Sequence, residues 1–213
     1  MTGFWEASFA EKQTMWGFEP AESAIVAKDF FLKEKVKDVL IPGSGYGRNA
    51  RVFLDAGMIV TGIEISKTAI ELAKNQNKLD MPVYNGSVAD MPFDDKLYDG
   101  IFSYALIHLL NTDERAKFIR DCYNQLQPNG TMIFSFISKN DPMYGSGQEL
   151  SKDWFEMSSG VKLFFYDADS IRHEFGNYGL MDFHAMDEPV KFTLHHLPMK
   201  FIVVKCKKIG ADA

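Results

Sequence analysis

Residues 39–48 read VLIPGSGYGR, an apolar run that ends in three glycines separated by single residues. A helix-compatible run follows and ends near Ala56. The order strand, glycine loop and helix is typical of an open parallel sheet, in which nucleotide-like ligands bind at the carboxyl end of the first strand. Glycines suit this place because they adopt backbone angles that other residues avoid and allow a ligand to approach the main chain.

The spacing of the glycines favours one class of cofactor over another. A dinucleotide-binding loop follows the pattern Gly-x-Gly-x-x-Gly. Counted from Gly43, this pattern needs a glycine where the chain has Arg48, and the third glycine comes one residue earlier, at Gly47. Glu64 gives a second signal, because it ends the apolar run 58–63 about 20 residues after the first glycine, the offset expected for a carboxylate that binds ribose hydroxyls. The alternative interpretation is a generic α/β loop followed by a surface glutamate.

Length and composition indicate one globular domain. A chain of 213 residues is large enough for a sizeable core and is one domain by default. The hydrophobic content of 46% and the charged content of 24% are ordinary for globular proteins. The formal net charge of -6 argues against duplex nucleic acid as a substrate, because phosphate binding needs a concentrated basic surface.

Three features predict a reduced, cytoplasmic setting. Cys122 and Cys206 lie within apolar patterns, which favours buried thiols over a disulfide. No apolar run approaches the roughly 20 residues that a membrane-spanning helix needs. Residues 1–6 have neither the basic nor the apolar region of a secretory signal. We therefore expect a cytoplasmic protein with no membrane partner.

Strands and helices alternate along most of the chain, so the sequence predicts a single doubly wound α/β domain with a β pair appended at its end. Ser66 is predicted to cap the helix that follows the second strand. Residues 127–130 are predicted to form a turn. The predicted strands are 39–41, 58–63, 82–85, 98–104, 131–137, 181–187 and 199–206, and the predicted helices are 21–35, 48–56, one from 66, one from 112, and one that Asp167 or Asp169 opens and that ends at 175.

Two segments break this rhythm. Residues 1–20 are rich in aromatic side chains, and they form either an amphipathic helix that covers the sheet or a lid that closes over a cofactor; Trp16 fits both interpretations. Residues 139–160 read as a long loop because they contain Asp141-Pro142 and two stretches of glycine and serine. Loops of this length are usually functional, so we expect both segments to border a substrate pocket.

Residues 37–137 resemble the class I S-adenosylmethionine-dependent methyltransferases. A narrower likeness is to the thiopurine and tellurite-resistance methyltransferase group. It is carried by the Ile-Pro-Gly form of the glycine loop at 41–43, by SVADMP at 87–92, and by Phe4-Trp5-Glu6 with Trp16 ahead of the first strand.

The resemblance implies a Rossmann-like domain over residues 1–213, built on a seven-stranded, mostly parallel sheet with a terminal antiparallel strand. It also implies an N-terminal helical lid region at 1–36 and a substrate-side insertion at 139–165. The implied cofactor is S-adenosyl-L-methionine. The residues with implied cofactor contacts are Gly43, Ser44, Gly45, Gly47 and Tyr104 at the methionine part, Glu64 at the ribose, Ile65, Ser87 and Val88 at the adenine, and Trp16 closing over the cofactor.

Three positions qualify this likeness. Asp90 is a rival for the adenine amino group, and the alternative is a loop carboxylate that caps its own backbone. Most class I enzymes carry an acidic residue two positions before the first glycine, where this chain has Ile41, so the ammonium group of the cofactor must meet backbone carbonyls or another side chain. Residues 103–106 read SYAL, which is not the Asn-Pro-Pro-aromatic motif of enzymes that methylate base amino groups.

Methyl transfer needs an acceptor atom held in line with the sulfonium methyl and kept dry. A soft nucleophile such as a thiolate needs little more, whereas a hydroxyl or an amine needs a general base. The candidates for this base are His108, His195, His196 and Tyr144, and an ordinary structural or surface role is the alternative for each histidine. We expect no metal site, because the adjacent His195 and His196 point apart and no third ligand lies at a recognised spacing.

The sequence therefore predicts an enzyme that transfers a methyl group from S-adenosylmethionine to a small-molecule acceptor. The acceptor atom, whether sulfur, oxygen, nitrogen or another chalcogen, stays open. We expect a monomer or a homodimer without a nucleic-acid partner. Two rival functions are a non-catalytic protein that binds S-adenosylmethionine or S-adenosylhomocysteine, and a nicotinamide-dependent oxidoreductase, which Arg48 at the position of the third glycine disfavours.

Overall fold

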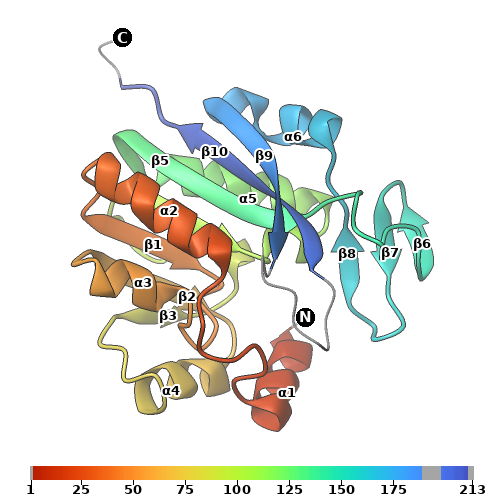
Figure 1. The fold of residues 1–213 in the computed structure, drawn as a ribbon, viewed down its shortest axis with the longest axis horizontal. Helices are drawn as coiled ribbons and strands as arrows, with labels where there is room; N and C mark the ends of the chain where they lie inside the picture. Colours follow the sequence, from red (N-terminus) through yellow and green to blue (C-terminus); the bar gives the residue numbers. More distant parts are fainter. Residues whose placement is uncertain (1, 189–197, 211–213) are drawn as a thin grey trace.

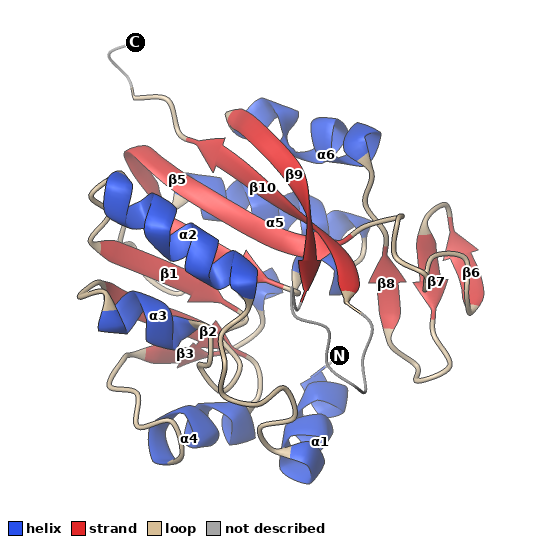
Figure 2. Ribbon diagram, in the orientation of Figure 1, coloured by secondary structure: helices blue, strands red, loops and turns tan. Residues whose placement is uncertain are grey.

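The computed structural model describes residues 2–188 and 198–210. Its centre is a seven-stranded sheet with the strand order β3-β2-β1-β4-β5-β10-β9 (Figures 1 and 2). The first five strands in this order pair in parallel, and β10 is antiparallel to both of its neighbours. These findings confirm the predicted α/β fold. The strands are β1 (Asp38–Pro42), β2 (Ile59–Glu64), β3 (Val83–Asn85), β4 (Tyr98–Tyr104), β5 (Leu126–Ile137), β9 (Leu180–Glu188) and β10 (Met199–Lys207).

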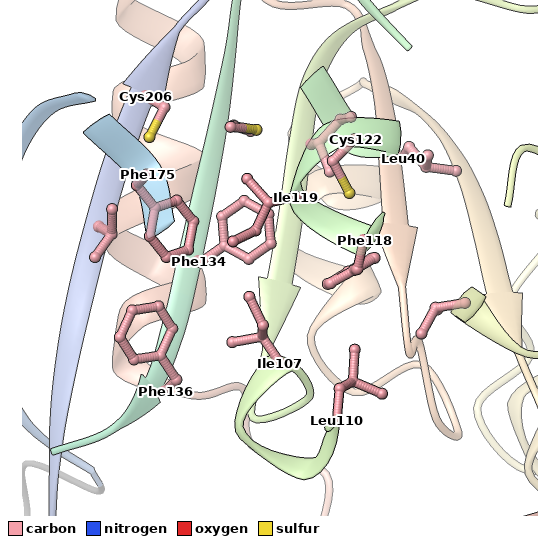
Figure 3. Close-up of a cluster of buried hydrophobic side chains, with 14 of the residues drawn as sticks. Leu40, Ile107, Leu110, Phe118, Ile119, Cys122, Phe134, Phe136, Phe175 and Cys206 are labelled. Atoms are coloured by element: carbon pink, nitrogen blue, oxygen red, sulfur yellow. The ribbon is translucent and has the colours of Figure 1, made fainter. Parts of the chain in front are cut away.

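Helices cover both faces of the sheet (Figure 2). On one face Phe53 of α3 packs against Phe102 of β4, with ring centroids 5.4 Å apart. On the other face Phe134 of β5 packs against Phe175 of α6 at 5.2 Å, within the cluster that Figure 3 shows. Two apolar cores therefore enclose the sheet. The helices are α1 (Thr2–Lys12), α2 (Glu22–Lys33), α3 (Ala50–Asp55), α4 (Lys67–Asn75), α5 (Thr112–Asn124) and α6 (Ala168–Phe175).

Local sequence determines where three of these helices begin. Ser66 Oγ accepts a hydrogen bond from the first turn of α4 at 3.0 Å, which confirms the predicted cap. Asn111 and Glu114 form a reciprocal capping box at the start of α5. Asp167 caps α6. α4 and α5 start after the parallel strands β2 and β4 have ended, so their N-termini lie at the edge of the sheet where the carboxyl ends of the strands gather.

One of the two sequence interpretations placed an N-terminal helix over the sheet. The structure shows a different position for this helix. α1 lies beside α4, at the carboxyl edge of the strands (Figure 1). Phe9 of α1 is buried against Tyr46, Ala69 and Leu72. Tyr46 belongs to the glycine loop and the other two residues belong to α4, so α1 packs on the elements that follow β1 and β2.

The prediction of one long loop at 139–160 is wrong. This segment forms β6 (Gln148–Ser151) and β7 (Trp154–Glu156), which join β8 (Lys162–Phe164) in a small antiparallel sheet beside the main one (Figure 1). All four residues of β6 are exposed, so no alternation of apolar residues marks this strand in the sequence. Asp153, in the turn between β6 and β7, pairs with Lys139 at 2.8 Å and ties the small sheet to the end of β5.

The predicted turn at 127–130 lies within β5. Tyr98 pairs with Leu126, and Gly100 pairs with Thr131, so residues 127–130 bulge out of the ladder between two paired positions. The amide of Asn129 donates to the carbonyl of Lys208, and the amide of Lys208 donates to that of Gly130, both at 2.9 Å. The end of β10 thus pairs with the bulge, and the turn-forming residues continue the strand because a neighbouring segment satisfies their backbone.

The helix predicted at 21–35 is α2. Its buried face includes Ala24, Ala27 and Phe31, whereas Leu32 is 48% exposed. Cys122 and Cys206 are free and buried. Within the described ranges, no helix is long and apolar enough to cross a membrane.

Candidate cofactor site

The glycine loop follows β1 and turns at each of its three glycines. Gly43, Gly45 and Gly47 have φ angles of +69°, +55° and +81°, in the left-handed region that favours glycine. The amides of Gly43 and Ser44 both donate to the carbonyl of Ile63, at 2.8 and 3.0 Å, which fixes the loop to the end of β2. Gly43 and Gly45 stay partly exposed, so a ligand can reach their main chain.

Glu64 lies between the glycine loop and the start of α4. Its Oε2 accepts a hydrogen bond from the amide of Gly45 at 2.7 Å, and its Oε1 accepts one from the amide of Ser66 at 2.9 Å. The residue is 5% exposed. Burial raises the pKa of this carboxyl above its ordinary value, while the two amides act in the opposite direction. Glu64 is therefore held in one orientation at the junction of two loops that the sequence analysis assigned to the cofactor.

Residues 13–21, which we call the strap, join α1 to α2 and lie against the glycine loop. The Tyr46 hydroxyl donates to the carbonyl of Gly17 at 2.7 Å and accepts from the amide of Trp16 at 3.1 Å. The rings of Trp16 and Tyr46 stack at an interplanar angle of 13°, with their centroids 6.2 Å apart. Trp16 is 48% exposed, so part of its surface stays available to a ligand.

The residues directly after the loop hold the rest of the strap. Arg48 Nη1 donates to the carbonyls of Trp16 and Glu19, at 3.4 and 3.0 Å. Asn49 Oδ1 accepts from the amide of Ala21 at 2.9 Å. Side chains at positions 46, 48 and 49 thus attach the strap to the glycine loop.

A second attachment joins α1 to the start of α4. The Glu6 carboxylate accepts hydrogen bonds from the hydroxyls of Ser66 and Thr68, at 2.7 and 2.6 Å. These hydroxyls lower the pKa of Glu6. The positive end of the α4 dipole favours a carboxylate at this place. Because the amide of Ser66 also donates to Glu64, α1 is attached beside the residue predicted to hold the ribose.

Tyr104 ends β4, so β1 separates it from Glu64 in the sheet. The Arg48 guanidinium carbon lies 5.5 Å from the centroid of the Tyr104 ring. Burial raises the pKa of Tyr104 to about 12; the charge of Glu188 acts in the same direction, and Arg48 acts against it. Glu188 is itself occupied at the start of α2, where its carboxylate accepts from the amide of Ser23 at 2.8 Å.

The residues predicted at the adenine lie after β2 and β3. Ile65 is half-buried, and its carbonyl accepts from the Asn85 side chain at 3.2 Å. Ser87 Oγ makes the local cap of the short helix at 88–90, the role that one alternative gave to Asp90, which is exposed. Val88 is 5% exposed in the core. These roles toward the adenine stay predictions.

His108 is buried in η2 (Ile107–Leu109), the short helix after β4, with 4% of its surface exposed. Its Nδ1 accepts from the amide of Ile137 at 3.2 Å, and its ring packs edge-on against Phe201. Burial lowers the pKa of His108 to about 3, so the imidazole is neutral at physiological pH. A structural role accounts for these contacts, and its role as a general base stays a prediction.

The other candidates for a base lie elsewhere. Tyr144 lies on the small-sheet side, where its hydroxyl donates to Asp153 at 2.8 Å and its ring packs against Phe155. His195 and His196 fall in 189–197, outside the described residues. Across residues 2–188 and 198–210, no group of three histidine, cysteine, aspartate or glutamate side chains is arranged to hold a metal ion.

This edge of the sheet fits a cofactor that has a nucleoside at one end and an amino acid at the other. Each Glu64 oxygen accepts one N–H and keeps a lone pair for a further donor, such as a ribose hydroxyl. Next to it, Gly43 and Gly45 present main chain. Beyond them, Arg48 and Tyr104 supply polar groups. S-adenosylmethionine presents ribose, sulfonium and amino acid in the same order.

The segment that carries this geometry is similar to a known protein family. Residues 40–134 match the methyltransferase domain family. This methyltransferase segment runs from β1 into β5 and contains the glycine loop, Glu64 and Tyr104. The match supports an S-adenosylmethionine-dependent methyltransferase as the enzyme class and S-adenosylmethionine as the cofactor.

Curated relatives are similar over part of the chain. Demethylmenaquinone methyltransferase of Tropheryma whipplei (strain Twist) is 32% identical over 101 residues, which cover 46% of this chain and 40% of the relative. The chain thus spans less than half the length of the curated relatives that it matches first.

Solved structures share the fold over nearly the whole chain. The 1,6-didemethyltoxoflavin-N1-methyltransferase of Burkholderia thailandensis, with bound 1,6-didemethyltoxoflavin and S-adenosylhomocysteine, aligns with a TM-score of 0.75 at 14% identity, covering 98% of this chain and 87% of the other. TehB from Haemophilus influenzae aligns with a TM-score of 0.64 at 16% identity, covering 96% and 67%. At these identities the likeness shows the fold alone.

No pattern in the sequence indicates the side chains that attach the strap and α1. These are Glu6, Tyr46, Arg48 and Asn49. Their partners lie 28 to 62 residues away, and no spacing rule connects them. The available signals were weak: Glu6 belongs to the Phe-Trp-Glu motif, and Tyr46 is a large side chain between two glycines.

Proposed function

We propose that this chain is an S-adenosylmethionine-dependent methyltransferase that acts on a small molecule. When bound, the cofactor supplies an activated methyl group on its sulfonium. The proposal is carried by the Glu64 carboxylate, which is buried at the end of β2 and oriented by the amides of Gly45 and Ser66. Such a carboxylate can accept from ribose hydroxyls, and each charge-assisted hydrogen bond contributes about 1.5–3 kcal/mol.

The other cofactor contacts follow from the order of the strands. Residues after β1 and at the end of β4 take the methionine part, and residues after β2 and β3 take the adenine. The proposed contacts are Gly43, Ser44, Gly45, Gly47 and Tyr104 on the methionine side, Ile65, Ser87 and Val88 on the adenine side, and Trp16 in the strap.

An apolar cluster supports a place for the acceptor next to Tyr104. Its members come from α1, η2, β5, the small sheet and β10. Its partly buried side chains include Trp5, Tyr104, Met143, Met157 and Met199. We infer a largely apolar acceptor that lies between the N-terminal lid region (1–36) and the insertion (139–165).

The need for a general base depends on the acceptor atom. His108 is a weak base with a pKa of about 3 and serves a hydroxyl or amine acceptor poorly. Tyr144, His195 and His196 stay proposed candidates. A thiol acceptor needs the least help, because its thiolate is already a soft nucleophile.

Three finer points belong to the same proposal. The TehB fold likeness gives loose support to the thiopurine and tellurite-resistance grouping. A cytoplasmic location and a monomeric or homodimeric state follow from the sequence analysis and are proposed on that basis.

Calorimetric titration with S-adenosylmethionine, S-adenosylhomocysteine and NADH tests the proposal. We expect binding of the first two and none of NADH. Glu64→Ala should weaken binding at least about tenfold, because a lost charge-assisted bond exceeds 1.4 kcal/mol. Glu71→Ala, on the exposed side of α4, is the matched control and should bind as the wild type does. Unchanged affinity in Glu64→Ala would contradict the assigned site.

A panel of thiols, phenols and amines then separates an enzyme from a non-catalytic binding protein. Methylation of any member, followed by release of S-adenosylhomocysteine, supports the proposed activity. Tight cofactor binding without turnover on any member favours the binding protein.

A further inference from the structure

His108 is a buried imidazole whose two ring nitrogens have different partners. Its Nδ1 accepts a hydrogen bond from the amide of Ile137 at 3.2 Å, so this nitrogen carries no proton. Burial keeps the ring neutral at physiological pH, because it lowers the pKa of His108 to about 3. A neutral imidazole has one proton, on the nitrogen that does not accept. The backbone of β5 therefore selects the tautomer of His108 that carries its proton on Nε2.

The Nε2–H group of His108 has no acceptor in the part of the chain that the structure describes, where the ring makes its hydrogen bond through Nδ1. The residue is 4% exposed. Nε2 is not one of the fully enclosed side-chain atoms that lack a partner there, so part of its surface stays open. Buried donors are nearly always paired, because an unmade hydrogen bond is costly. This donor is therefore available to a group from outside the chain.

His108 contacts the apolar cluster next to Tyr104, in which we place the methyl acceptor. Ile137 and Phe201 are buried members of this cluster, as is Leu109, the residue that follows His108 in η2. The imidazole meets the Phe201 ring edge-on, with the ring centroids 5.9 Å apart. The Tyr104 ring packs on the same Phe201 ring at 5.7 Å. His108 thus brings a polar hydrogen close to the residue proposed at the methionine end of the cofactor.

Two polar side chains on the small-sheet side of this cluster differ from His108. The Tyr144 hydroxyl donates its one proton to Asp153 at 2.8 Å. Lys139 pairs with the same carboxylate, also at 2.8 Å. Both donors already have an anionic partner within the chain, so His108 is the better placed donor for a bound molecule.

We propose that His108 donates a hydrogen bond from Nε2 to an oxygen of the methyl acceptor. Because Tyr104 and His108 pack on one ring, this oxygen lies close to the atom that takes the methyl group. The acceptor class is then an apolar ring with a carbonyl or phenolate oxygen beside its nucleophilic atom. The inference rests on the proposed function, since it assumes that the acceptor binds next to Tyr104. His108 determines specificity by donating a hydrogen bond, not by removing a proton.

Pairs of isomeric probes test this inference. The probes are methyl sulfanylbenzoate, methyl hydroxybenzoate and methyl aminobenzoate, each as the ortho and the para isomer. The two isomers have the same atoms, but only the ortho isomer has a carbonyl oxygen beside the nucleophilic atom. In at least one pair, the wild type should methylate the ortho isomer with a kcat/KM at least about fivefold higher, the effect of one hydrogen bond.

Three variants assign this preference to the donor. His108→Leu has no donor and should methylate both isomers with nearly equal kcat/KM. His108→Gln offers an oxygen to the Ile137 amide and an N–H to the acceptor, so it should keep part of the preference. His173→Leu, on the exposed side of α6, is the control and should keep all of it.

The ratio of the two isomers separates recognition of the acceptor from packing. If His108 is purely structural, His108→Leu lowers kcat/KM for both isomers by the same factor and keeps the wild-type ratio, which would overturn the inference and spare the proposed function. A wild type without an ortho preference would overturn it as well. Cofactor binding without methylation of any probe contradicts the inference and the proposed activity, but not the cofactor site. His108→Met also lacks a donor, so it gives the same comparison should His108→Leu fail to fold.

Discussion

Gly45 and Gly47 share a left-handed backbone, but their surroundings differ. A Cβ on Gly45 would lie 3.8 Å from the nearest atom, Phe9 Cζ, whereas a Cβ on Gly47 would lie 2.1 Å from Leu79 Cδ1. Alanine at either place takes on roughly 1–2 kcal/mol of backbone strain, and at Gly47 overpacking adds about 1–3 kcal/mol. We expect Gly47→Ala to be the less stable variant in urea unfolding. Equal stability would show that Leu79 moves aside without cost.

His108 makes the folded chain sensitive to acid. Its pKa is about 3 in the folded protein, against an ordinary value of 6.5. Between these values the unfolded state binds more protons than the folded state, so stability is lost as pH falls from about 6.5 toward about 3. His108→Gln keeps an acceptor for the Ile137 amide and removes the titration. The melting temperature of this variant should depend less on pH across that window, and an unchanged pH profile would contradict the buried, neutral imidazole.

Some residues of the candidate site could be predicted and others could not, for a physical reason. Gly43, Gly45 and Glu64 come at the ends of strands, so their meeting follows from the parallel order of β1 and β2. Arg48 and Tyr46 act on the strap, whose path is irregular. Their partners depend on tertiary packing, which no local pattern in the sequence encodes.

The strap is an element without regular structure, and Tyr46 fixes it. Tyr46→Phe removes the hydroxyl that bonds Gly17 and Trp16 while it keeps the ring stacked. A lost hydrogen bond of this kind contributes about 0.5–1.5 kcal/mol, so amide hydrogen exchange within the strap should become several-fold faster. Tyr123 lies on α5 and its ring packs on Tyr178, so the control variant Tyr123→Phe should leave strap exchange unchanged. Wild-type exchange in Tyr46→Phe would show that stacking alone holds the strap.

Regular elements were predictable where burial leaves a periodic pattern. β4 has the boundaries that its apolar run predicts, since all but two of its residues are buried. β6 leaves no such pattern because all four of its residues are exposed. The bulge in β5 reads as a turn because Pro128, Asn129 and Gly130 favour turns in isolation. Both errors arise where tertiary partners, rather than local preference, satisfy the backbone.

For the whole molecule, cofactor binding and folding are linked. A ligand that binds only the folded state at a hundred times its Kd stabilises it by about 2.7 kcal/mol. For a chain of 213 residues this corresponds to a rise in melting temperature of about 5–10 °C. We expect S-adenosylhomocysteine to produce this shift in thermal unfolding. Glu64→Ala at the same concentration should show a smaller shift, and an equal shift with NADH would contradict the proposed cofactor.

The type of the sheet, seven-stranded and mostly parallel with a terminal antiparallel strand, was the most predictable property. Alternating strands and helices with short connections allow few topologies. Each crossover brings the chain back to the edge at which the previous strand began, so the carboxyl ends of all parallel strands lie at one edge of the sheet. The position of α1 was not accessible in this way. Its aromatic residues suit a helix on the sheet as well as a helix on α4. The tertiary contacts of Phe9 with Ala69 and Leu72, and of Glu6 with Ser66 and Thr68, decide between them.

The antiparallel course of β10 has a practical consequence for handling the protein. Lys207 pairs with Thr131, near the amino end of the parallel run of β5, whereas α1 lies at the opposite edge beside Glu64. A purification tag or a surface-coupling handle placed after β10 therefore points away from the candidate site. The same addition before Thr2 would crowd the segment that packs on the glycine loop. Binding constants measured with such a tag would then include the free energy needed to displace the tag from the site.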